Sequence, residues 1–119
     1  RERMAERLPP GLIAPPVELP DRASSYHLFA VAIDFDRLGR SRAEVMADLA
    51  ARGVGTQVHY IPLLRHPAHA ARVRNPGLPR PGAERYYART LSLPMFPAMS
   101  DADVDLVVDA LRHVLGGAA

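Results

Sequence analysis

The sequence predicts an α/β (α+β) fold in which a small sheet of about three strands is packed with helices. Short apolar segments typical of strands alternate along the chain with segments of helical periodicity. Two helix starts are marked by a serine in capping position. The 119 residues, 48% of them hydrophobic, suffice for one modest core. We therefore expect residues 1–119 to form a single domain.

The first third of the chain is expected to contain a helix, a connector and the clearest strand. Residues 1–8 read as a helix with no capping residue in front, so we expect them to be the tail of a longer helix. Five prolines favour an extended connector over residues 9–21. Large and small apolar residues alternate over residues 28–35, which predicts a strand covered on both faces. Residues 36–40 then form a turn.

The middle of the chain predicts a helix, a second strand and a loop. Ser41-x-x-Glu44 is a capping box that starts a helix over residues 42–52, and Gly53 ends it in the left-handed conformation. Residues 54–61 (VGTQVHYI) predict a strand that a proline ends, and residues 63–80 a loop with about one helical turn. The inner face of the helix is expected to carry Val45, Met46, Leu49 and Ala50.

The last third predicts two helices around a short extended segment at residues 91–93. Proline suits the first turn of a helix over residues 81–90. Ser100 caps the clearest helix, residues 100–115, which Gly116 and Gly117 end. The inner face of the first helix would carry Ala83, Tyr86, Tyr87 and Thr90, and that of the second Val104, Val107, Val108, Leu111 and Leu115.

The composition argues against several classes of function. All 15 basic residues are arginine and stand against 13 acidic residues, so we expect no dedicated nucleic-acid surface. Without cysteine there is no thiolate chemistry. No apolar segment reaches the ~18 residues of a membrane span, and a cytoplasmic location is the default expectation. Without lysine, no side chain carries a primary amine.

Histidines are the groups of this chain that titrate near neutral pH: His27, His59, His66, His69 and His113. His66-x-x-His69 would place two imidazoles on one side of a turn with His59 as a third ligand, but no acid stands at ligand spacing, and we expect no metal. His59 ends a predicted strand, where α/β folds build sites; the alternative is a half-buried histidine that holds a loop carbonyl. His113, at a helix end, is read as structural. No glycine-rich phosphate loop or nucleophile elbow is present.

Three strings, residues 53–62 (GVGTQVHYIP), 81–97 (PGAERYYARTLSLPMFP) and 100–111 (SDADVDLVVDAL), together carry a resemblance. They resemble the C-terminal small domain of the DegT/DnrJ/EryC1/StrS aminotransferases, fold type I enzymes that use pyridoxal phosphate to aminate keto sugars carried on nucleotides. With the leading helix and SSYHLF, the resemblance covers nearly the whole chain. GTQVHYIP is most similar to the transaminases of pseudaminic-acid biosynthesis, which use glutamate and a UDP-N-acetyl-hexosamine derivative.

The resemblance implies a substrate-binding role for four residues. His59 would face the sugar-nucleotide or cofactor pocket, with Gln57 and Tyr60 nearby and His27 of SSYHLF as a weaker candidate. It also implies that the cofactor-holding lysine belongs to a large domain absent from these residues. We therefore expect no catalytic residue, no bound cofactor and no activity in this chain alone. Residues 64–69 (LRHPAH) depart from the HLQPYY common in relatives, which puts substrate contacts from that loop in doubt.

A stand-alone binding or self-assembly module derived from the same domain is the alternative function. Separation from the large domain would expose an apolar patch, and such patches on small domains favour association. We therefore expect a homodimer or another form of self-association through that surface.

Overall fold

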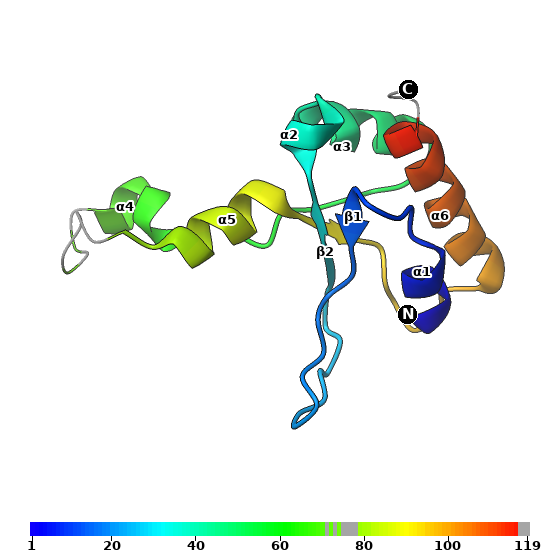
Figure 1. Ribbon diagram of the computed structural model, residues 1–119, viewed down its shortest axis with the longest axis horizontal. Coiled ribbons are helices and arrows are strands. Elements are labelled where there is room, and N and C mark those ends of the chain that lie inside the picture. Colours follow the sequence, from blue (N-terminus) through cyan, green and yellow to red (C-terminus); the bar gives the residue numbers. More distant parts are fainter. Residues whose placement is uncertain (71, 73, 75–78, 117–119) are drawn as a thin grey trace.

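The computed structural model describes residues 1–70, 72, 74 and 79–116 of the chain (Figure 1). At its centre lies an antiparallel sheet in the order β1-β2-β3, formed by β1 (Ile13–Ala14), β2 (Phe29–Ile33) and β3 (Thr90–Leu93). The α/β fold with a small sheet of about three strands is confirmed. The first strand lies within the proline-rich connector, where the sequence predicted none.

The register of β2 and β3 separates an apolar face of the sheet from an open one. Phe29 pairs with Leu93 and Val31 with Leu91, and all four side chains are buried. The alternating positions of β2 are less covered, since Ala32 is exposed. The prediction that this strand is covered on both faces is therefore wrong. Its small residues alternate with large ones because only the large ones meet the core.

Three helices supply much of the rest of the core: α1 (Glu2–Arg7), α3 (Arg42–Ala51) and α6 (Asp101–Gly116). Helix α6 packs against both α1 and α3 (Figure 1). The expected stripe of α6 is buried and is extended by Ala110 and Val114. No helix within the described part of the chain is both long enough and apolar enough to cross a membrane.

Capping side chains fix the starts of α3 and α6 as the sequence predicted. The Ser41 hydroxyl accepts a hydrogen bond from the Glu44 amide at 3.3 Å. In return, the Glu44 carboxylate accepts hydrogen bonds from the hydroxyl of Ser41 at 2.6 Å and from its amide at 2.7 Å. Ser100 and Asp103 repeat the arrangement at α6. Helix α1 has no side-chain cap, as expected. Reciprocal bonds satisfy amides that a helix start leaves free.

The ends of these elements differ from the predictions by a few residues. Gly53 ends α3 with φ +79°, as expected, but the last helical residue is Ala51, and Ala50 is exposed rather than on the inner face. Helix α6 runs through Gly116, and Gly117, the second predicted stop, lies outside the described residues.

A short helix, α2 (Phe35–Leu38), replaces the end of the predicted strand and most of the predicted turn. The Asp34 carboxylate accepts the Arg37 amide at 3.1 Å, which caps the helix. Gly39 ends it with φ +68°. The strand stops before Asp34 because an aspartate in this position favours a helix start over continued sheet pairing.

The predicted strand at residues 54–61 is wrong, because only Gln57 pairs with the sheet, in an isolated bridge to Ser92. An antiparallel ladder would next pair residues 55 and 59 with Pro94 and Thr90. Pro94 has no amide, and the amide of Thr90 donates to a carbonyl of the preceding helix instead. The edge of β3 can therefore hold one bridge and no strand.

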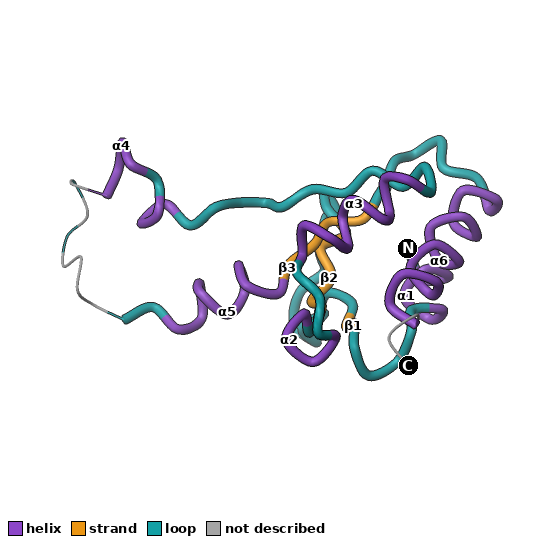
Figure 2. Tube along the Cα trace, turned by 90° about the horizontal axis from the view of Figure 1, so that it is seen from above, coloured by secondary structure: helices purple, strands orange, loops and turns teal. Residues whose placement is uncertain are grey.

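The segment after residue 61 forms an arm that projects from the body of the molecule (Figures 1 and 2). It comprises a 3-10 turn, η1 (Leu63–Arg65), and the helices α4 (Pro67–Ala70) and α5 (Pro81–Arg89). Helix α5 starts at a proline, as predicted. The 3-10 turn η1 and the short helix α4 agree roughly with the expected loop of residues 63–80 with about one helical turn. Residues 71, 73 and 75–78 of that loop lie outside the described part of the chain.

The predicted inner face of α5 is wrong for Ala83, Tyr86 and Tyr87, because no residue of the helix is buried in the core. Thr90, the fourth residue of that face, is buried but belongs to β3. Ala83 is exposed and Tyr86 is 52% exposed. The guanidinium groups of Arg42 and Arg65 both lie over the ring of Tyr87, 4.7 Å and 5.1 Å from its centre. The aromatic residues of α5 therefore contact arginines of α3 and η1 or line the open face of the sheet, and they do not enter the core.

We predict that the two capping boxes make folding stability fall in acid. Hydrogen bonds from the hydroxyl and then the amide of Ser41 lower the pKa of Glu44, and those of Ser100 lower the pKa of Asp103 in the same way. A lowered folded pKa gives stability above the unfolded value of about 4, which is lost as the pH falls through the folded value. Urea unfolding at pH 7 and pH 3 measures this loss.

Replacement of the cap residue Ser100 should reduce the loss of folding stability between pH 7 and pH 3. Ser100→Ala is expected to cost about 1 kcal/mol at pH 7 and less at pH 3, whereas Ser25→Ala, an exposed serine outside any cap, should change neither value. An equal cost of Ser100→Ala at both pH values would contradict the coupling.

Candidate functional site

A hollow of about 300 Å³ lies where the segment after α3 meets the edge of β3. Pairing of Gln57 with Ser92 brings this segment to the strand, and His59 follows two residues later on the same side. The hollow is lined by Leu28, Gly55, Thr56, Gln57, His59, Ser92, Leu93 and Pro94. Two of the four predicted site residues, Gln57 and His59, therefore line one hollow.

The imidazole of His59 is oriented by a serine of the sheet. Its Nδ1 lies 2.9 Å from the Ser92 hydroxyl, and Ser92 is only 5% exposed. His59 Nδ1 is the only partner of that hydroxyl among the described residues. A buried hydroxyl needs an acceptor for its proton, so we assign Ser92 as donor and His59 Nδ1 as acceptor. The proton of the neutral ring then sits on Nε2, which can donate to a bound group.

The other two predicted residues lie outside the hollow. Tyr60 is 73% exposed and touches His59 edge-on, with ring centroids 4.7 Å apart. His27 is exposed and does not line the hollow, although its neighbour Leu28 does. In the structure, Tyr60 thus contacts His59, whereas His27 does not line the hollow.

Sequence reasoning missed Ser92 and misplaced Tyr86. Ser92 is the polar residue between two buried leucines in LSLP, a signal that could have marked it. The hydroxyl of Tyr86 donates to the backbone carbonyl of His59 at 3.4 Å, which holds that residue from the side of α5. His59 is therefore fixed through both its ring and its backbone.

The three-histidine metal site does not form. The rings of His66 and His69 lie 5.2 Å apart on the arm. Within the described ranges, no three histidine, cysteine, aspartate or glutamate side chains gather as metal ligands. Spacing of two histidines along a turn does not bring a third from another element.

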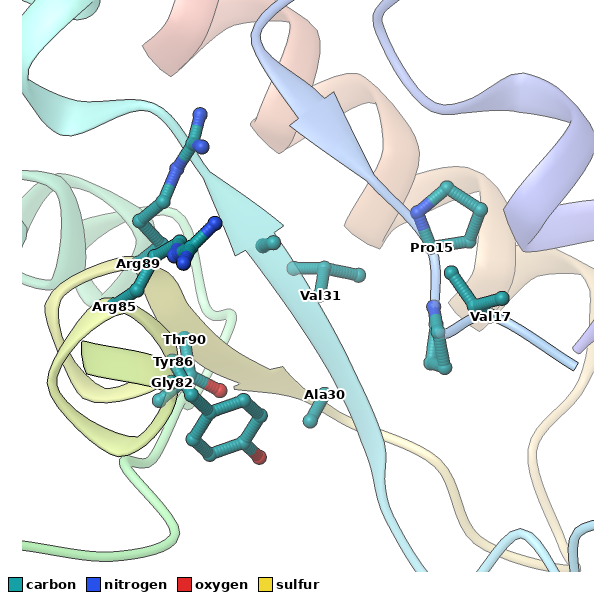
Figure 3. A pocket seen from close by; sticks show the side chains of 11 residues that line it. Pro15, Val17, Ala30, Val31, Gly82, Arg85, Tyr86, Arg89 and Thr90 are labelled. Atoms are coloured by element: carbon teal, nitrogen blue, oxygen red, sulfur yellow. The ribbon is translucent and has the colours of Figure 1, made fainter. Parts of the chain in front are cut away.

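A second hollow, of about 360 Å³, lies on the open face of the sheet beside α5 (Figure 3). Its floor is β2 around Ala30 and Val31, with Arg85 and Arg89 of α5 on one side and Pro15 across the strand. Sequence reasoning missed this site as well. The four-residue spacing of Arg85 and Arg89 shows that they share a face of the helix. It does not show that this face borders a hollow, which only the structure reveals.

Comparisons with known proteins agree on one family. The family model for the DegT/DnrJ/EryC1/StrS aminotransferase family matches residues 2–112. The spore coat polysaccharide biosynthesis protein SpsC of Bacillus subtilis (strain 168) is 40% identical over 110 residues, which cover 92% of this chain and 28% of SpsC. The aminotransferase TlmJ from Streptoalloteichus hindustanus superposes with a TM-score of 0.81 at 32% identity, covering 99% of this chain and 30% of TlmJ.

A third protein bears on the expected similarity to pseudaminic-acid transaminases. PseC of Helicobacter pylori, an aminotransferase involved in the biosynthesis of pseudoaminic acid, superposes with a TM-score of 0.79 over 98% of this chain and 30% of PseC. Its identity is 21%, which supports a common fold and nothing finer. The chain spans less than a third of the length of each of these proteins.

We predict that Ser92 sets the tautomer of His59. Nitrogen-15 NMR of the neutral ring should show the proton on Nε2 in the wild type, and Ser92→Ala should give a mixture of the two tautomers. Ser92→Thr keeps the hydroxyl and should restore the wild-type spectrum. A His59 ring protonated mainly on Nδ1 in the wild type would contradict the assignment.

Proposed function

Because this chain belongs to the DegT/DnrJ/EryC1/StrS aminotransferase family, we propose that it is the C-terminal small domain of a pyridoxal-phosphate-dependent enzyme. That enzyme would transfer an amino group from glutamate to a nucleotide-linked keto-deoxy sugar. The observation that carries the proposal is the family match over residues 2–112, combined with a coverage of less than a third of the relatives. A pseudaminic-acid type of substrate, a UDP-linked 4-keto-N-acetyl-hexosamine, is the finer form of the proposal.

In this proposal the chain positions the substrate and makes no covalent bond to it. His59, through the Nε2 proton that Ser92 leaves on the ring, donates to a hydroxyl or phosphate oxygen of the sugar nucleotide. Gln57 on the same hollow adds an amide group, and exposed Tyr60 extends the surface beside His59. His27 remains a weaker candidate, because it is exposed and does not line the hollow, although the adjacent Leu28 does.

The chain itself does not fit the covalent anchoring of the cofactor. Enzymes of this family depend on pyridoxal phosphate, which supplies the electron sink for amino transfer when bound. Anchoring it as an imine needs a side-chain primary amine, and all 15 basic residues here are arginine, whose guanidinium stays protonated. The lysine-bearing large domain must then lie outside these 119 residues, and the chain alone is inactive.

The second candidate function is a non-catalytic self-assembly module. It is favoured by exposed apolar side chains on the arm and on the two residues before it. Tyr60, Ile61, Leu63 and Tyr86 are between 52% and 73% exposed. Exposed apolar residues gathered on one segment of a small domain favour association. A homodimer in the cytoplasm, formed through this surface, would be compatible with either function.

We predict that a hybrid enzyme reveals the role of His59. In the hybrid, residues 1–119 replace the segment of SpsC that they match, so that SpsC supplies the remainder. Amino transfer from glutamate to a UDP-linked 4-keto-N-acetyl-hexosamine is expected in the hybrid and not in the chain alone. His59→Ala should raise KM for the sugar roughly tenfold, the loss of one hydrogen bond, with little change for glutamate.

His113→Ala is the matched control, since this exposed histidine lies in the last turn of α6, far along the chain from the hollow. Equal effects of the two substitutions would remove His59 from the site. A hybrid that takes up the cofactor, as seen by its absorbance, and transfers no amino group to any nucleotide-linked keto sugar would contradict the proposed function itself.

We predict that the chain self-associates through the arm. Sedimentation equilibrium at high protein concentration should show a dimer, and the double substitution Ile61→Ser and Leu63→Ser should shift it toward monomer by removing exposed apolar surface. Leu106→Ser, at a residue of α6 that is 50% exposed, should leave the dimer intact. A wild-type chain that stays monomeric throughout would refute this association.

A further inference from the structure

The open face of the sheet forms one surface that joins the two hollows. In the register of β2 and β3, Ala30 pairs with Ser92 and Ala32 with Thr90, opposite in direction to the buried pairs. Ser92 belongs to the His59 hollow, whereas Ala30, Ala32 and Thr90 belong to the hollow beside α5. The two hollows are thus neighbouring parts of a single face.

Tyr86 forms the boundary between the two hollows. Its ring lines the hollow beside α5 (Figure 3), and its hydroxyl reaches the carbonyl of His59. A ligand that fills the His59 hollow therefore has a second, adjoining space available on the far side of one tyrosine.

The space beside α5 carries an unbalanced positive charge. Arg89 is paired, since its Nη2 lies 2.6 Å from Asp34 Oδ2. Arg85 has no ion pair or hydrogen bond within the described part of the chain. The nearest acid on the same helix, Glu84, is engaged by Arg65 instead. One guanidinium is therefore left to face the hollow with no acidic partner.

Two buried polar atoms beside the same hollow also lack partners. Arg89 Nε and Thr90 Oγ1 are buried, and neither forms a hydrogen bond with the described residues. Thr90 is 2% exposed, so bulk water does not compensate for the missing bond. Unsatisfied buried groups are uncommon in folded proteins, and each calls for a partner such as a bound water, an ion or a ligand atom. The Nε–H of Arg89 can only donate and the hydroxyl of Thr90 can also donate, so an acceptor would satisfy both atoms.

We propose that Arg85 and Arg89 form an oxyanion subsite on the open face of the sheet, which anchors one end of a ligand whose other end meets His59. Arginine on a rigid helix binds carboxylate and phosphate oxygens with paired donors. Pro15, Ala30 and Ala32 line the same hollow and can contact an apolar or aliphatic part of the ligand next to its charged group. The subsite rests on the proposed function, in which both a carboxylate donor and a sugar nucleotide enter the enzyme.

The shared chemistry of the ligand is an oxyanion, which the amino donor supplies as a carboxylate and the sugar nucleotide as a phosphate. NMR titration of the chain with two probes, L-glutamate and UDP, distinguishes these sources. With the probe that binds, we expect saturating shifts of the Arg85 and Arg89 Nε–H signals and of the Ala32 amide. Arg85→Gln should weaken that binding at least about tenfold, because a charge-assisted contact is lost.

Arg52→Gln is the matched control, because Arg52 is exposed at the end of α3, has no side-chain partner among the described residues, and carries the same charge. Equal weakening by both substitutions, or shifts at His59 that do not depend on Arg85, would overturn the subsite and leave the proposed function standing. The absence of shifts with both probes would also overturn it. Failure of the SpsC hybrid, with Arg85-dependent binding retained, would instead remove only the proposed function.

Discussion

Burial of a single face of the sheet is the constraint on which the rest of the structure depends. Phe29, Val31 and Leu91 must all point toward α6 and its neighbours to complete the core. Because side chains alternate along a strand, the residues between them must point the other way. A register slip of one residue would exchange the two faces. Core packing therefore decides that Ser92 and Thr90 face the hollows, although neither takes part in that packing.

The short β3 strand has a second consequence for the site. Its edge bonds the His59 segment only at Gln57, because Thr90 completes helix α5 and Pro94 has no amide. His59 is therefore held by side chains rather than by a strand ladder: the Ser92 hydroxyl holds its ring and the Tyr86 hydroxyl holds its carbonyl. Substitutions of Ser92 in the sheet and of Tyr86 in the arm should thus both change the position of the His59 imidazole.

The sequence predicted what local chemistry determines and failed where a distant partner decides. Helices α3 and α6 were found because capping boxes and apolar stripes lie within each segment. The strand at residues 54–61 was wrong, since its pairing depends on the amides of β3 and not on its own apolar residues. The structure places Gln57 and His59 on one hollow, while their role in binding a substrate stays a prediction. The arginine hollow could not be foreseen, because spacing shows that α5 has a face and not what that face meets.

Because all of its lysine and arginine positions hold arginine, the chain can bind anions through these side chains but cannot form an imine with them, whereas lysine could do both. A lysine amine forms imines when deprotonated, whereas a guanidinium stays charged and presents a planar set of donors. With arginine in all 15 basic positions, every cation here suits holding an oxyanion and none suits covalent catalysis. Under the proposed function, the small domain contributes geometry, with Arg85 at one end of an open sheet face and His59 at the other. Under the same proposal, the covalent chemistry falls to an amine outside these 119 residues.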